Sequence, residues 1–158
     1  MLTTNMYVLE KISRRIPFLL LILCLCTPFA GAQQKRAISI PGIPKDLPFS
    51  PGIVAGDTLY VAGQEGTDDS GKLKAGGIAA ETQAALENIE KVCKAAGFET
   101  KDIVSVTVFL ADIHEFGDMN KVYRNFLPDP KPARATVQVA GLVNNARVEI
   151  SAIAVKQK

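Results

Sequence analysis

Two charged side chains near the end of the chain, Arg134 and Glu149, are of the types that bind and activate small molecules. A guanidinium can hold a carboxylate through paired hydrogen bonds, and a carboxylate can take a proton from water. Each residue lies in a segment of alternating apolar and polar residues, a pattern that predicts a β-strand with two distinct faces. Strands hold side chains rigidly, as a small-molecule site requires. Spacing alone leaves open whether the two groups meet.

The alternation divides the side chains of each strand between two faces. In the first segment Arg134 shares a face with Thr136 and Gln138, and in the second Glu149 shares a face with Ser151. We expect these five polar residues to line one common sheet face, alongside apolar side chains. Such a face is poorly suited to simple solvation, so it predicts oligomerisation, with the polar residues gathered in clefts between subunits.

The rest of the domain predicts strands and helices in alternation. A Gly-Asp pair at 56–57 between apolar runs indicates a hairpin. Apolar residues at every third or fourth place over 78–96 indicate an amphipathic helix that ends at Gly97. Asp112 and Glu115 form a candidate capping box at the start of a second helix. The predicted order is β-β-(β)-α-β-α-β-β, an α+β fold whose mixed sheet carries both helices on one face.

Residues 1–32 have the three-part pattern of a secretory signal peptide. A basic stretch at 11–15 precedes an apolar run at 16–26, and small residues then lead up to Ala32. The run is shorter than the ~20 residues of a permanent membrane helix. We expect cleavage between Ala32 and Gln33, a periplasmic or secreted protein, and no membrane attachment afterwards. An uncleaved N-terminal anchor is the alternative.

Cleavage would leave one neutral domain, residues 33–158. Three of the 18 basic residues and one of the 16 acidic residues lie in the leader, so 15 of each remain. No basic patch marks a nucleic-acid partner. Cys93 and His114 are the domain's only cysteine and histidine, which excludes a zinc-ligand pattern and a Cys-His pair. We expect Cys93 to be a buried apolar residue, His114 to be exposed, and neither a metal nor a cofactor to be used.

Seven stretches with a characteristic order and spacing run through the domain. They are Pro48 to Gly52, Leu59 to Gln64, Thr82 to Gly97, Val106 to Leu110, Met119 to Tyr123, Pro132 to Arg134 and Val148 to Ala154. Together they resemble the RidA/YjgF/UK114 family of reactive-intermediate (imine) deaminases. The resemblance implies a chorismate-mutase-like α+β fold, assembled as a homotrimer with three ligand clefts between subunits.

The resemblance also implies a hydrolase without metal or organic cofactor. Such deaminases convert 2-imino acids and their enamine tautomers, for example 2-aminoacrylate, 2-iminopropanoate and 2-iminobutanoate, to 2-oxo acids and ammonia. Arg134 matches the arginine that binds the substrate carboxylate, and Glu149 matches the glutamate that positions or activates water. Asn120 and Gly63 match positions that line the cleft, and we expect Thr136, on the same strand face as Arg134, to line it too.

Three positions depart from the family pattern. Phe49 stands in the expected cleft wall where the deaminases usually carry a tyrosine. Ala62 replaces a common Ser or Thr, and Ser151 stands where many members carry a second acidic residue. The loss of three polar groups predicts a drier pocket, with a changed substrate choice or a lower rate.

Two other functions stay open at this point. The first is a non-catalytic trimer that binds a small carboxylate or another metabolite. The second is a ribonuclease or translation inhibitor, an activity attributed to some relatives, against which the neutral charge and the lack of an aromatic stacking face both count. Export also sets a difficulty for the deaminase, because enzymes of the cytoplasm usually make these enamines.

Overall fold

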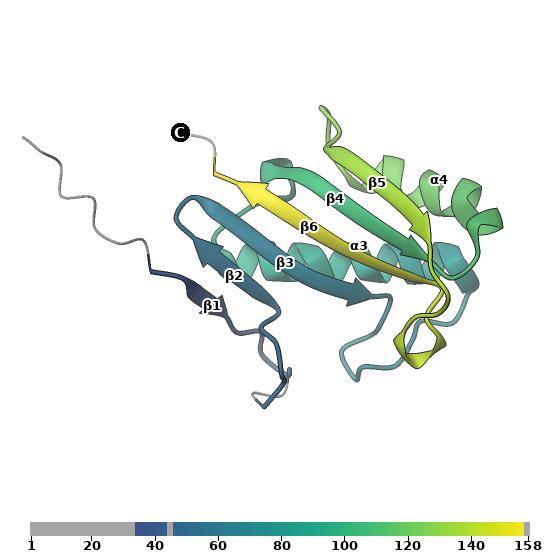
Figure 1. Cartoon of the computed structure of the whole chain (residues 1–158), viewed down its shortest axis with the longest axis horizontal. Helices are drawn as coiled ribbons and strands as arrows, with labels where there is room; N and C mark the ends of the chain where they lie inside the picture. Colours follow the sequence, from purple (N-terminus) through teal and green to yellow (C-terminus); the bar gives the residue numbers. More distant parts are fainter. Residues whose placement is uncertain (1–33, 44–45, 157–158) are drawn as a thin grey trace, which may run out of the picture. The chain divides into compact units, whose positions relative to one another are not determined.

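The computed structural model describes residues 34–43 and 46–156. These residues form a six-stranded sheet with two α-helices (Figure 1). The elements are β1 (Arg36–Ile38), β2 (Gly52–Ala55), β3 (Thr58–Glu65), α3 (Gly77–Ala96), β4 (Ile103–Leu110), α4 (Phe116–Phe126), β5 (Ala133–Gln138) and β6 (Val148–Val155). This order confirms the predicted α+β fold. The expected leader and its cleavage site lie outside the described residues.

The sheet is mixed, as predicted. Its strands run in the order β1-β2-β3-β6-β4-β5, and every neighbouring pair is antiparallel except β4 and β5. Two parallel strands need a crossover connection, which α4 provides. The helices α3 and α4 contact one another and lie on the same side of the sheet in Figure 1.

Glycines lie in the turn of the hairpin and at the end of the long helix, where the sequence predicts them. The β2–β3 turn contains Gly56 with φ 67°, a left-handed conformation that glycine adopts without strain. Helix α3 ends at Gly97, whose N–H donates to the Lys94 carbonyl at 3.0 Å. The next N–H, of Phe98, donates to the Cys93 carbonyl at 2.8 Å, and the Phe98 ring is buried. The predicted turn and the predicted end of the helix are therefore both confirmed.

The predicted capping box is wrong. Asp112 does accept a hydrogen bond from the His114 N–H, at 2.9 Å, but it opens a short 3₁₀ turn, Ile113–Glu115, and α4 begins only after this turn. The Glu115 carboxylate does not reach back to Asp112, because it forms an ion pair with Arg147. His114 is exposed, as expected.

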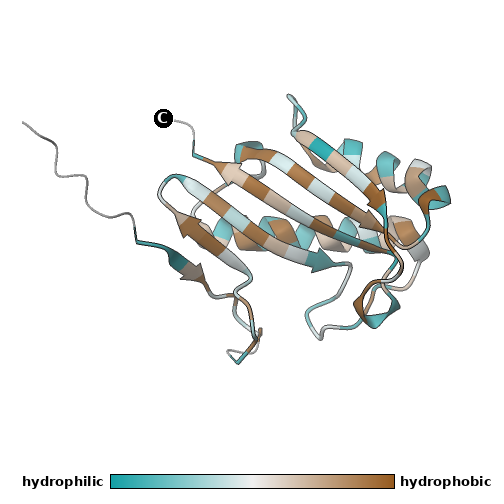
Figure 2. Cartoon of the chain, viewed as in Figure 1, coloured by the Kyte–Doolittle hydropathy of each residue, from teal (hydrophilic) through white to brown (hydrophobic). Residues whose placement is uncertain are grey.

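The core lies between the sheet and the helices, and the other sheet face is open. Figure 2 shows apolar residues alternating with polar ones along the strands. Strand β4 pairs with a strand on each edge, and Val104 on this strand is 41% exposed. Cys93 is buried, and burial, with the charges of Asp102 and Glu90, raises its thiol pKa to about 11. This confirms its structural role.

No helix in the described part of the chain has the length and apolar content to cross a membrane.

Candidate active site

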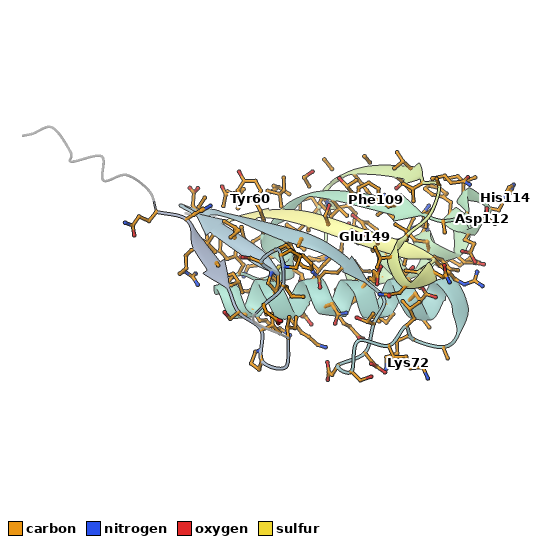
Figure 3. All side chains as sticks on the ribbon, turned by 60° about the horizontal axis from the view of Figure 1, so that its bottom comes forward. Tyr60, Lys72, Phe109, Asp112, His114 and Glu149 are labelled. Atoms are coloured by element: carbon orange, nitrogen blue, oxygen red, sulfur yellow. The ribbon has the colours of Figure 1, made fainter. Side chains whose placement is uncertain are left out.

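Arg134 and Glu149 project from opposite faces of the sheet. Arg134 is in register with Val106, a core residue, so its side chain lies on the helix side. Glu149 is in register with Phe109, and Figure 3 places both of them, with Tyr60, on the side away from α3. The predicted common face is therefore wrong. Alternation fixes the faces within one strand, but the phase between two strands is set by their register.

The neighbouring polar residues follow the same division. Thr136 lies on the helix side with Arg134, and its hydroxyl oxygen is buried without a hydrogen-bond partner among the described residues. Gln138 accepts a hydrogen bond from the Ile113 N–H at 3.3 Å. Ser151 lies on the open face with Glu149. A single chain thus presents two half-sites.

The first half-site is a cavity of about 610 Å³ at the sheet edge beside β5. Its lining residues are Asn120, Tyr123, Arg124, Asp129, Lys131, Pro132 and Arg134. The Arg134 guanidinium carbon lies 4.4 Å from the ring centroid of Tyr123 and 5.6 Å from that of Phe116. These rings stabilise the flat cation by cation–π contact. Within residues 34–43 and 46–156, Arg134 has neither a side-chain hydrogen bond nor an ion pair, so its N–H groups can bind a ligand.

The charge of this cavity favours an anion. It holds three cationic side chains against one carboxylate, that of Asp129. Lys131 is already engaged, because its Nζ donates to the Arg124 carbonyl at 2.9 Å and lies 3.5 Å from the Asp129 carboxylate. Arg124 and Arg134 remain, and of these Arg124 is exposed, whereas Arg134 is half-buried and held by two rings. Arg134, with Asn120 lining the same cavity, is therefore the group best placed to bind a small carboxylate.

The second half-site lies on the open face, where the Glu149 carboxylate sits over Gly63. The register of β3 shifts between Val61 and Gln64, a β-bulge that brings the Gly63 backbone close to β6. A Cβ added at Gly63 would collide with Oε1 of Glu149, so the close approach requires glycine. Burial, and then the charge of Glu65, raise the pKa of Glu149. A raised pKa makes the carboxylate a stronger base, which favours its taking a proton from water.

The structure thus joins some expected site residues and separates others. Asn120 lines one cavity with Arg134, and Gly63 touches Glu149. Phe49 is 57% exposed on the loop before β2 and forms no closed wall within one chain. Sequence reasoning missed Glu65, the register partner of Glu149. The sequence does show an acidic residue two positions after Gly63, at the end of a strand. Only the strand register shows that Glu149 is its partner.

No cluster of three or more histidine, cysteine, aspartate or glutamate side chains suited to a metal ion occurs among the described residues.

A family profile described as Endoribonuclease L-PSP matches residues 43–156. The match covers both half-sites and all strands from β2 onward. The chain belongs to the RidA/YjgF/UK114 family. This confirms the resemblance that the sequence motifs indicated.

Curated relatives in the RidA/YjgF/UK114 family carry a functional name. A protein of Bos taurus named 2-iminobutanoate/2-iminopropanoate deaminase is 46% identical over 124 residues, which are 77% of this chain and 90% of the relative. The Homo sapiens protein of the same name is 40% identical over the same shares of the two chains.

Solved structures of the family share the fold. RidA from an Antarctic Psychrobacter is 35% identical, with a TM-score of 0.72, and the match covers 77% of this chain and 99% of that one. TdcF of E. coli, solved with bound serine, is 30% identical with a TM-score of 0.71 over the same shares.

Proposed function

We propose that this protein hydrolyses reactive 2-imino acids and their enamine tautomers to 2-oxo acids and ammonia. The observation that carries the proposal is the Arg134 guanidinium, held by two aromatic rings of α4 and lining a cavity with three cationic side chains and one carboxylate. Two further observations support the substrate class. Relatives carry the name 2-iminobutanoate/2-iminopropanoate deaminase, and TdcF holds serine, a small molecule with a carboxylate.

The proposed site is shared between subunits of a homotrimer. Arg134 and Glu149 lie on opposite faces, so one chain cannot bring both to one small substrate. In the proposed trimer the β5 edge of one subunit packs against the open face of the next, and each cleft takes Arg134 from one copy and Glu149 from its neighbour. Apolar side chains on the open face support this packing, since Tyr60 is 50% and Val137 is 44% exposed in one chain.

The proposed mechanism needs one binding group and one proton carrier. Arg134 binds the substrate carboxylate and so fixes the adjacent C2, which is already electrophilic in the iminium form. Water adds to C2 while Glu149 takes one of its protons. Glu149 then gives this proton to the amino nitrogen of the carbinolamine. The C–N bond breaks, the hydroxyl proton passes through Glu149 to the departing ammonia, and the products are ammonium and the 2-oxo acid, with Glu149 ionised again.

Turnover separates this proposal from a non-catalytic carboxylate-binding trimer. 2-Aminoacrylate or 2-iminobutanoate is generated in situ, and 2-oxo acid formation is followed with the purified protein. We expect Arg134→Ala to lower kcat/KM by about 100-fold or more, the order expected when an oriented substrate is lost. Glu149→Gln should bind ligand but hydrolyse it slowly. Arg36→Ala, an exposed arginine on β1, is the matched control. Equal rates for wild type, Arg134→Ala and buffer would leave only the binding trimer.

Export is part of the proposal and has a separate test. The signal-peptide pattern of residues 1–32 supports a periplasmic or secreted enzyme. N-terminal sequencing of the exported protein should begin at or near Gln33. A product that begins at Met1 and stays in the cytosol would contradict export without touching the chemistry.

A further inference from the structure

Glu65 and Glu149 form a carboxyl pair across β3 and β6. The two residues are register partners in the antiparallel ladder, so their side chains project from the same face of the sheet. Partners of this kind have Cβ atoms about 5 Å apart. Both residues are half-buried. Two carboxylates on such neighbouring positions repel one another when both are ionised, which favours a proton on one of them.

The Glu65 carboxylate is held at one oxygen and unpaired at the other. Nδ2 of Asn144 donates to its Oε2 at 3.0 Å. Asn144 has φ 56°, a left-handed conformation that asparagine tolerates better than most residues. Oε1 of Glu65 is buried and has no hydrogen-bond partner in the described chain. A buried acceptor without a donor is costly, and a proton carried by the neighbouring carboxyl group would supply the donor.

No cation of the described chain neutralises this pair. Strand β4 presents Phe109 to Glu149, and β3 presents Gly63. Arg147 is the nearest basic residue in sequence, but its guanidinium pairs with Glu115 and lies 3.9 Å from the carboxylate of Glu81. In the proposed trimer, the facing cation is Arg134 of the neighbouring copy. Burial, then the negative charge of Glu65, raise the pKa of Glu149 within one chain.

We propose that Glu65 acts through Glu149, as a positioning residue that shares one proton with it during hydrolysis. This inference rests on the proposed function. The proton that Glu149 takes from water as the C–O bond forms stays between the two carboxyl groups. It passes to the amino nitrogen before the C–N bond breaks. Glu65 does not contact the substrate, but it brings the two protonation states of Glu149 closer in free energy at neutral pH.

A carboxyl titration of Glu149 tests the pair directly. ¹³C NMR follows the glutamate carboxyl groups of the full protein, and Glu149→Gln assigns the resonance. In Glu65→Gln we expect the Glu149 midpoint to fall, because a negative neighbour has become a neutral donor. The acid limb of the kcat/KM profile should move to lower pH by the same number of units, since the Glu149 base form then persists in more acid solution. Glu87→Gln, on the exposed side of α3, should move neither.

The outcomes separate this inference from the proposed function. An unchanged Glu149 midpoint in Glu65→Gln, with normal wild-type turnover, overturns the inference alone. Absence of wild-type turnover together with a lowered midpoint overturns the function and leaves the shared proton standing. Should Glu65→Gln fail to fold, Glu65→Ala replaces it. Loss of the negative neighbour should again lower the Glu149 midpoint, and an unmoved midpoint in that variant also overturns the pair.

Discussion

Arg134 and Glu149 project from opposite faces of one sheet, from strands separated only by β4. A head-to-tail contact between copies of this chain would bring the two groups together. Such contacts close into a ring when the rotation between subunits permits it, and three subunits then make three equivalent clefts. Activity in this arrangement depends on assembly, which distinguishes it from a site contained in one chain.

Gly63→Ala should abolish hydrolysis without unfolding the protein. The new methyl group would collide with the Glu149 carboxylate and push it away from its position over β3. We expect a large fall in kcat/KM, measured with in situ 2-iminobutanoate, and a retained urea transition.

The matched control is Gly117→Ala in α4, where an added Cβ meets nothing within 4 Å. Alanine in a helix is favoured over glycine by about 1 kcal/mol, so this variant should be as active as wild type and slightly more stable. Wild-type kcat/KM in Gly63→Ala would show that the position of the Glu149 carboxylate does not matter.

The sequence predicts the elements of this fold well because their signals are local. The hairpin at 56–57 and the stop at Gly97 each follow from a few adjacent residues and a backbone conformation that glycine favours. Amphipathic spacing over 78–96 likewise identifies the buried side of α3. These features need no knowledge of the partner element.

The site is harder to predict because it depends on strand pairing. Alternation correctly separates Arg134 from its neighbours on β5, but it cannot say that Arg134 and Glu149 are out of phase across β4. The pairing of Glu65 with Glu149 has the same origin, since the 83 residues between them carry no signal of the register. The capping-box error also arises from a distant group, Arg147, which takes the Glu115 carboxylate.

Asp102→Asn should lower the free energy of unfolding at neutral pH, and should lower it less in acid. Burial favours the neutral form of Asp102, but hydrogen bonds from the Glu99 N–H at 2.9 Å and Lys156 at 3.1 Å outweigh burial and lower its pKa. A lowered folded-state pKa stabilises the protein above the ordinary value of 3.8, and this stability is lost as pH falls through the folded-state pKa.

Urea unfolding at pH 7 and at pH 3 measures this effect. We expect the free energy of unfolding of Asp102→Asn to lie about 2 kcal/mol below that of wild type at pH 7, the order of a hydrogen bond to a charged group. This difference between variant and wild type should be smaller at pH 3. Asp69→Asn, which breaks an exposed pair with Lys91, should change stability little at either pH. If the difference in free energy of unfolding between Asp102→Asn and wild type is the same at both pH values, the Asp102 pKa does not contribute to stability as proposed.

The shared cleft is tested most directly by mixing two inactive variants. Arg134→Ala and Glu149→Gln are unfolded together and refolded, and imine hydrolysis is compared with that of each variant refolded alone. A cleft is intact where a Glu149→Gln subunit supplies Arg134 and its Arg134→Ala neighbour supplies Glu149. Random assortment makes about a quarter of the clefts intact, so activity should return to about that fraction of wild type. Activity that stays at the level of the separate variants would contradict a site built from two subunits.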